Sequence, residues 1–396
     1  MLLSLATLLL VALVLNGLFI KLKLPGLIGM IGTGIILGPF VLNLIAPELL
    51  AISADLRKIA LIVILIRAGL SLDLKDLKRV GRPAILMCFV PATLEIAAIT
   101  LIAPLLFDMS YVEAAILGTV VAAVSPAVVV PRMIALIDRG YGKKNSIPQL
   151  IMAGASVDDI YVIVLFASFM AMYKTGSFDV ASLLKVPISI ILGIFFGLGV
   201  GLVLVYLFKK LHVRDTVKVI VILSTSFIMV YIEEFLQPMI PISGLLAIMT
   251  LGVTLLAYYG DLAVRLKSKF SKVWVGAEIL LFVLVGAAVD ITYVPQAGLA
   301  AIALIFIALL ARMVGVAISV TGTHLTKKER LFSAIAYLPK ATVQAAIGSI
   351  PLTQGVEAGN TILVVAVLAI IITAPIGAIG IDRGYKKLLD GPDEQS

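Results

Sequence analysis

Five charged residues lie inside long apolar stretches of this sequence, where a charge is costly. Asp158 and Asp159 are adjacent in one stretch, and Glu95, Arg312 and Lys340 lie near the middle of three others. A charged side chain at the centre of a bilayer costs at least about 2.5–3.5 kcal/mol, so such residues usually pair with one another or line a pathway. The pattern therefore predicts ion chemistry inside a membrane.

The aspartate pair has the chemistry of a site shared by a cation and a proton. Carboxylate oxygens are the ligands that hard cations prefer, and both burial and a neighbouring carboxylate favour protonation. Such a site releases its proton when it binds a metal ion, and it releases the metal ion when it binds a proton. This exchange is the minimal chemistry of an antiporter. A helix N-cap is the alternative role for the pair. It is disfavoured because Ile147 to Val157 already has a helical pattern.

Two apolar stretches are interrupted at mid-depth. Ser125 and Pro126 interrupt the first, where proline leaves carbonyl groups one turn earlier without a donor. Lys340, Thr342 and Gln344 cluster in the second, next to another proline. Discontinuous helices at the bilayer midplane are typical of secondary transporters, although a simple proline kink would also explain each interruption.

The rest of the chain supplies the elements that would hold these residues in a membrane. Of 396 residues, 61% are hydrophobic and 14% are charged, and the mean hydropathy is +1.17. Soluble proteins average about 45–50% apolar and about 25% charged residues, so an ordinary soluble protein, a disordered chain and a coiled coil are excluded. Apolar runs of about 20 residues recur, each long enough to cross the hydrocarbon as a helix. We expect an all-α polytopic membrane protein.

Polar loops divide the chain into thirteen predicted transmembrane helices, the first of them retained rather than cleaved as a signal peptide. Most of the 31 Lys and Arg residues fall in alternate loops, Lys75, Lys78 and Arg79 among them, and in the C-terminal tail. Because basic loops stay in the cytoplasm, we expect the N-terminus outside and the C-terminus inside. The predicted spans are 2–20, 24–44, 56–72, 83–106, 112–131, 147–173, 183–208, 217–236, 242–260, 273–289, 294–322, 331–352 and 359–381.

The two interrupted spans are the fifth and the twelfth, which are seven spans apart. Because seven is an odd number, a span and its equivalent seven positions later cross the bilayer in opposite directions. This is the arithmetic of an inverted repeat, in which spans 4–6 correspond to spans 11–13. Glu95 and Arg312 then occupy corresponding mid-span positions with opposite charge. We expect a buried ion pair between them. The alternative is that each side chain faces a separate aqueous crevice.

No pattern predicts a cofactor, a structural metal site or a catalytic site. The single cysteine, Cys88, cannot form an internal disulfide, and His212 and His324 lie among basic residues in loops. The net charge of +8 resides in short loops, which contact with membrane lipid explains better than nucleic-acid binding. A cation channel would need a selectivity filter or rings of charge, and no such pattern is found.

Four stretches of the sequence form recognisable motifs, and three of them contain candidate site residues. They are Leu65–Asp73 (LIRAGLSLD), Ala122–Pro131 (AAVSPAVVVP), Ala155–Ile160 (ASVDDI) and Ala336–Ser349 (AYLPKATVQAAIGS). In these motifs the sequence resembles the NHA-type sodium/proton antiporters of the cation/proton antiporter superfamily. The resemblance extends from about residue 56 to the end of the last span. Ala288 departs from the family pattern, in which an acidic residue is expected, and puts a third ion-linked carboxylate in doubt.

The resemblance implies an inverted-repeat antiporter fold with crossed discontinuous helices at Ser125–Pro126 and near Lys340. It implies that Asp159 is the main cation and proton carboxylate and Asp158 its partner. It also implies a homodimer in which a six-helix core moves like an elevator against a dimerisation domain. The implied parts are dimerisation helices in 1–80, core helices in 81–175, a linker helix in 176–210, dimerisation helices in 211–290, core helices in 291–385 and a short cytoplasmic tail in 386–396.

The predicted function is exchange of Na+ or Li+ for H+ across a cell membrane, serving pH homeostasis. A K+/H+ exchanger or a sodium-coupled symporter of the same fold stays open, as does the stoichiometry. An intramembrane aspartyl protease is a remote alternative, because its aspartates must face each other from separate helices. Here Asp158 and Asp159 are consecutive.

Overall fold

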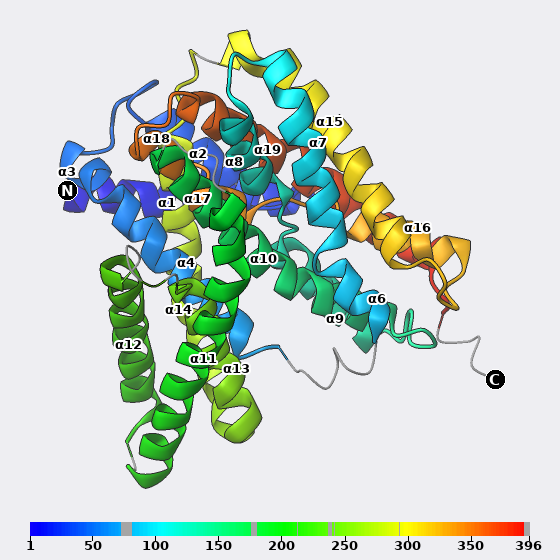
Figure 1. The fold of residues 1–396 in the computed structure, drawn as a ribbon. Helices are drawn as coiled ribbons and strands as arrows, with labels where there is room; N and C mark the ends of the chain where they lie inside the picture. Colours follow the sequence, from blue (N-terminus) through cyan, green and yellow to red (C-terminus); the bar gives the residue numbers. More distant parts are fainter. Residues whose placement is uncertain are drawn as a thin grey trace. The chain divides into compact units, whose positions relative to one another are not determined.

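The computed structural model describes residues 1–72, 81–175, 180–211, 213–236, 240, 242–292 and 294–391. The predicted basic loop residues Lys75, Lys78 and Arg79, together with His212 and the end of the predicted tail, lie outside these residues. Within the described part of the chain every regular element is a helix and no strand occurs (Figure 1). The expectation of an all-α fold is confirmed.

Each predicted span contains helix, but several helices are short or broken. Nine helical segments of the described residues are long and apolar enough to cross a membrane, and α2 and α13 are shorter apolar helices. Thirteen spans therefore stay a prediction. The helices are α1 (Leu2–Lys21), α2 (Leu27–Leu37), α3 (Pro47–Ala51), α4 (Ser53–Gly69), α6 (Arg82–Met87), α7 (Val90–Leu106), α8 (Tyr111–Ala122), α9 (Pro126–Asp138), α10 (Ile147–Thr175), α11 (Val180–Lys210), α12 (Asp215–Leu236), α13 (Gly244–Tyr258), α14 (Gly260–Ala287), α15 (Val294–Ser319), α16 (Lys327–Ala336), α17 (Thr342–Ile347), α18 (Ile350–Thr353) and α19 (Gly359–Leu388).

The two interrupted spans are true breaks rather than proline kinks. Residues 123–125 separate α8 from α9, and residues 337–341 separate α16 from α17, all without helical structure. The breaks meet, because the Ser125 N–H donates to the Pro339 carbonyl over 2.8 Å. The predicted discontinuous, crossed helices are confirmed. Pro126 begins α9, a position where its missing N–H costs nothing.

The first half of each broken helix begins with the same local motif. Ser110 caps α8 in a capping box with Glu113, and Thr326 caps α16 in a capping box with Glu329. In each box the hydroxyl and the carboxylate satisfy backbone N–H groups that the first helical turn leaves without partners. The two halves of the repeat thus share a capping box at corresponding positions, the starts of α8 and α16.

Each of these glutamates also reaches the other half of the repeat. Glu113 Oε1 accepts from the Ala358 N–H over 3.0 Å, just before α19, and Glu329 Oε1 accepts from Asn145 Nδ2 over 2.8 Å, just before α10. We call these two hydrogen bonds the cross-repeat contacts. They tie the start of each broken helix to the start of the last helix of the opposite half.

The chain divides into two compact units. The first comprises Met1–Ser53, Lys75–Tyr173 and Phe282–Ser396, and the second comprises Ala54–Leu74 and Lys174–Leu281, apart from the undescribed residues within those bounds. All the predicted site residues belong to the first unit, where α7 packs against α8 and α15, and where α19 packs against α15 and α16. The division into core and dimerisation domains stays a prediction.

In the second unit, α11 packs along α13 through small residues. A Cβ on Gly197 would lie 2.2 Å from the Ala247 carbonyl oxygen, and one on Gly201 would lie 2.7 Å from Thr254 Cβ. Helices in lipid approach closely where small residues recur every four positions. In the same unit, α12 packs against α13.

Candidate functional site

The aspartate pair lies within a continuous helix. Asp158 and Asp159 occupy the interior of α10, well past its first turn, so neither residue is a helix cap. Asp158 is fully buried, and Asp159 is partly buried. Adjacent residues on a helix point about 100° apart, so the two carboxylates border different parts of their surroundings.

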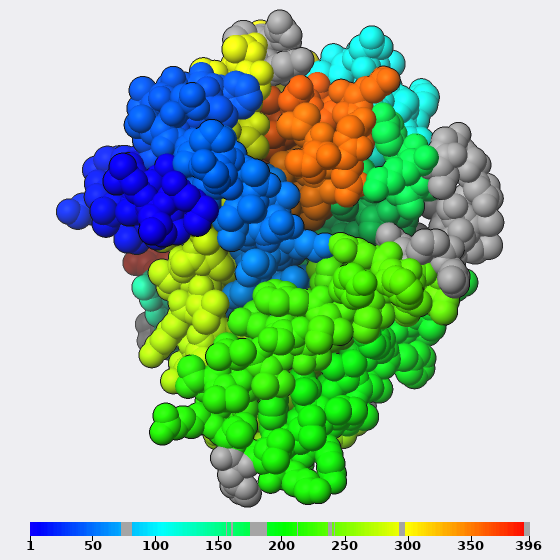
Figure 2. All heavy atoms as spheres, turned by 90° about the vertical axis from the view of Figure 1, so that its left-hand side faces the viewer, coloured from blue at the N-terminus to red at the C-terminus, as the bar shows by residue number. Residues whose placement is uncertain are grey.

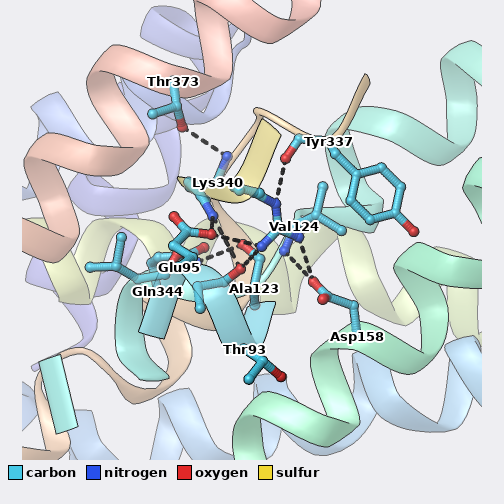
Figure 3. A network of polar contacts seen from close by, with 12 residues as sticks. Thr93, Glu95, Ala123, Val124, Asp158, Tyr337, Lys340, Gln344 and Thr373 are labelled. Carbon is cyan, nitrogen blue, oxygen red and sulfur yellow. Dashed lines mark hydrogen bonds and ion pairs between the residues drawn. The ribbon is translucent and has the colours of Figure 1, made fainter. Parts of the chain in front are cut away.

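Asp158 links α10 to the first break. Its Oδ2 atom accepts two hydrogen bonds, from the Val124 N–H over 2.8 Å and from Arg312 Nη2 over 2.8 Å. Figure 3 shows the Asp158 carboxylate directed toward this network, beside Val124. The contact with the charged guanidinium is a charge-assisted hydrogen bond, which is about twice as strong as a neutral one.

Arg312, from α15, is the centre of the network. Its Nη1 atom donates to Glu95 Oε2 over 2.7 Å and also to the Ala122 carbonyl, and its Nε atom donates to the Tyr337 carbonyl over 2.8 Å. With the bond to Asp158, one guanidinium contacts α7, α10, the last residue of α8 and the second break. Arginine suits this position because its planar fork presents five fixed donors and stays charged when buried.

Lys340 lies in the second break and reaches the same glutamate. Its Nζ atom lies 2.6 Å from Glu95 Oε2 and 3.1 Å from the Ala122 carbonyl oxygen. Its backbone N–H donates to Thr373 Oγ1 on α19 over 2.9 Å. Glu95 is therefore held by two cations, while among the described residues only Arg312 is ion-paired with the aspartate pair.

The end of α8 explains why cations gather at this point. The last carbonyls of a helix have no intrahelical donor and carry partial negative charge. Gln344 Nε2 donates to the Val121 and Ala123 carbonyls over 3.0 and 2.9 Å, and Arg312 and Lys340 bind the Ala122 carbonyl. A broken helix thus creates acceptors that only buried donors can satisfy.

Ser125 and Thr342 face each other across the two breaks. Their hydroxyl oxygens lie 3.5 Å apart, and both side chains are buried. With Pro126 at the start of α9 and Gln344 inside α17, the structure brings all the predicted supporting residues to one crossing point.

Three carboxylates at the crossing each keep one free oxygen. Glu95 Oε1, Asp158 Oδ1 and Asp159 Oδ1 are buried and have no hydrogen-bond partner within the described part of the chain. Buried polar atoms are normally satisfied, so such atoms need an explanation. Carboxylate oxygens of this kind fit a proton or a hard cation. No group of three or more His, Cys, Asp or Glu side chains suited to a resident metal occurs among the described residues.

The charges at the crossing do not balance. Glu95 and Asp158 are compensated by Arg312 and Lys340, each with ion-pair distances of 2.6–2.8 Å. No ion pair to Asp159 is present in the residues that the structure describes. An ionised carboxylate with a buried oxygen and no fixed countercharge is costly, and Asp159 is the member of the pair that the network leaves uncompensated.

Two residues of the site, Tyr337 and Thr373, were not among the predicted site residues. Tyr337 contributes its backbone carbonyl, and its hydroxyl packs on Gly154, where an added Cβ would lie 1.9 Å from it. Thr373 binds the backbone of Lys340, as Figure 3 shows. A lone polar residue within the apolar run of α19 was the available signal for Thr373. A backbone acceptor such as Tyr337 has none.

Comparison with known proteins gives a consistent picture. The family described as "Sodium/hydrogen exchanger, transmembrane" matches residues 5–383. The chain is 34% identical over 361 residues to sodium/hydrogen exchanger 9B2 of Homo sapiens, covering 87% of this chain and 66% of that protein. It is 32% identical over 342 residues to sodium/hydrogen exchanger 9B1 of Homo sapiens, covering 83% and 65%. The chain thus spans just under two thirds of the length of these relatives.

The fold is also that of a solved antiporter. The structure of the sodium proton antiporter MjNhaP1 from Methanocaldococcus jannaschii at pH 8 superposes with a TM-score of 0.86, covering 97% of each chain at 19% identity. An electron-microscopy structure of the same protein gives a TM-score of 0.77. At this identity the likeness establishes the antiporter fold.

Proposed function

The chain belongs to the transmembrane sodium/hydrogen exchanger family, and on that premise we propose that it is a secondary active antiporter exchanging Na+ or Li+ for H+. The observation that carries the proposal is the uncompensated carboxylate of Asp159, beside the compensated Asp158, at the crossing of two broken helices. The transported ions are the substrates, and we propose no cofactor and no enzymatic step.

Asp159 is the exchanging carboxylate in this proposal. It holds either a proton or the cation, and Asp158 contributes its free oxygen while Arg312 fixes its position. Ser125 and Thr342 supply hydroxyl oxygens close by. Lys340 and Glu95 fix the second break against the end of α8. The carboxylates are therefore already positioned when the ion binds.

Alternating access follows from the cost of a bare charge. Carrying an ionised carboxylate past an apolar surface is expensive, whereas a protonated or cation-loaded carboxylate is neutral. We propose that the core, helices within 81–175 and 291–385, moves in an elevator manner against the remaining helices of a homodimer. We also propose residence in the cell membrane, with the N-terminus outside and the C-terminus in the cytoplasm.

Proteoliposomes containing an interior pH dye test the exchange. An outward Na+ or Li+ gradient should drive proton entry in the wild type, and Asp159→Asn should abolish the response. Asp261→Asn is the matched control, because this exposed aspartate makes no ion pair in the described residues. Failure of the wild type with Na+ and Li+ would overturn the function, whether or not K+ is exchanged. Full activity of Asp159→Asn would overturn the site.

A further inference from the structure

A basic groove lies in the second unit, whereas the aspartate pair belongs to the first. It occupies the end of α11, the start of α12 and the first turns of α14, and it is an open groove with a volume of about 630 Å³. Pockets that bind small organic groups commonly measure about 300–1,000 Å³. The residues that line it are Phe208, Lys209, Leu211, Val213, Arg214, Asp215, Thr216, Lys218, Tyr259, Arg265 and Lys269.

The groove is strongly and unevenly charged. Five of its side chains are basic and one is acidic. The single carboxylate, Asp215, serves both Lys218 over 3.4 Å and Arg265 over 2.9 Å. Lys209, Arg214 and Lys269 have no ion pair among the described residues. Like charges held together in one cavity repel one another, so an anion bound here would relieve a repulsion that the chain itself leaves uncompensated.

The groove also contains cations held in place by packing. The Lys218 side chain is only 7% exposed, and its Nζ atom lies 5.8 Å from the centre of the Phe208 ring. Lys209 Nζ lies 5.6 Å from the centre of the Tyr259 ring. A buried or ring-stacked amine loses less conformational freedom on binding than a mobile surface lysine. These features distinguish the groove from an ordinary basic loop.

The surroundings of the groove identify its occupant. It lies at the ends of α11, α12 and α14, which are long and apolar enough to span a membrane. Leu211 in its lining is 51% exposed, and Tyr206 on α11 is 63% exposed; Figure 2 shows the green spheres of α11 and α12 on the surface of this unit. At the ends of membrane-spanning helices we expect headgroup depth, where basic pockets between helices bind lipid headgroups.

We propose that this groove binds the phosphodiester headgroup of an anionic phospholipid, with the acyl chains lying along the apolar side chains of α11 and α12. The lysines and arginines donate charge-assisted hydrogen bonds to the phosphate oxygens. The inference concerns a second site and does not rest on the proposed ion exchange.

Native mass spectrometry and thermal unfolding of the full chain test the proposal. The probes are phosphatidylglycerol, phosphatidylcholine and glycerol phosphate. The double variant Lys209→Gln, Lys269→Gln should weaken phosphatidylglycerol retention at least about tenfold and lose the thermal stabilisation by that lipid. The matched control Lys327→Gln, Lys328→Gln removes the same charge from exposed positions on α16 and should change neither.

Three results would overturn the proposal. Equal weakening in the control would show that only net charge matters. Equal retention of phosphatidylcholine would show that the headgroup charge is irrelevant. Competition by glycerol phosphate at the concentration at which the lipid binds would show a site for a soluble phosphate instead. None of these readouts uses ion exchange, so a failure of the proposed function leaves them interpretable.

Discussion

At the scale of single residues, Arg312 has more hydrogen-bond partners in the structure than the sequence pattern predicts. Its expected partner was Glu95, and the structure adds Asp158 and two backbone carbonyls. Removing one partner of a buried ion pair typically costs about 3–5 kcal/mol, because the other charge is left uncompensated. We expect Arg312→Ala to lower the unfolding temperature in detergent markedly.

Arg132→Ala is the matched control for that measurement. Arg132 pairs with Asp382 over 3.1 Å, but the Asp382 side chain is 56% exposed. Exposed pairs contribute about 0–1 kcal/mol, so this variant should unfold near the wild-type temperature. Equal unfolding temperatures for the two variants would contradict the central role of Arg312.

Lys340 should act on exchange more than on folding. Glu95 keeps Arg312 as a partner when Lys340 is removed, so the fold loses less than in Arg312→Ala. The crossing becomes one charge more negative, which favours retention of a proton. We expect Lys340→Ala to move the pH of half-maximal exchange upward in the proteoliposome assay, and Lys340→Arg to restore it in part. An unchanged profile would show that the lysine has no electrostatic effect on the site.

At the scale of elements, the breaks were predictable and their consequences were not. Proline and polar residues in apolar runs indicate where α8 and α16 end, because both features oppose a continuous helix. The contacts made at the crossing depend on how two helix ends approach in space, which no local pattern encodes. The capping boxes were readable, as Ser-x-x-Glu at 110–113 and Thr-x-x-Glu at 326–329. They lie at the starts of the apolar runs, so the order of the spans does not depend on them.

The cross-repeat contacts can be separated from the caps that share their residues. Glu113→Ala removes both the capping box and the bond to the Ala358 N–H, whereas Ser110→Ala removes only the hydroxyl of the cap. A lost cap costs about 0.5–2 kcal/mol, and a buried N–H left unpaired costs about 1–3 kcal/mol more. We expect Glu113→Ala to be the less stable variant in thermal unfolding. Equal loss in both would show that the cross-repeat contact contributes nothing.

At the scale of the whole molecule, the charge count at the crossing predicts the stoichiometry of the proposed exchange. Arg312 and Lys340 compensate Glu95 and Asp158, and in the proposed exchange Asp159 is the one carboxylate that changes its occupant. A core that carries Asp159 with one proton in one direction, and with one Na+ in the other, has the same net charge in both. One H+ should then exchange for one Na+, with no net movement of charge.

Membrane potential tests this prediction. Moving one elementary charge across 100 mV is worth about 2.3 kcal/mol, so exchange of two protons per Na+ would shift strongly when the potential is clamped. We expect equal rates and equal final pH gradients in proteoliposomes clamped at about 0 and 100 mV, of either sign. A final gradient that follows the potential would contradict one-for-one exchange and show that net charge moves in each cycle.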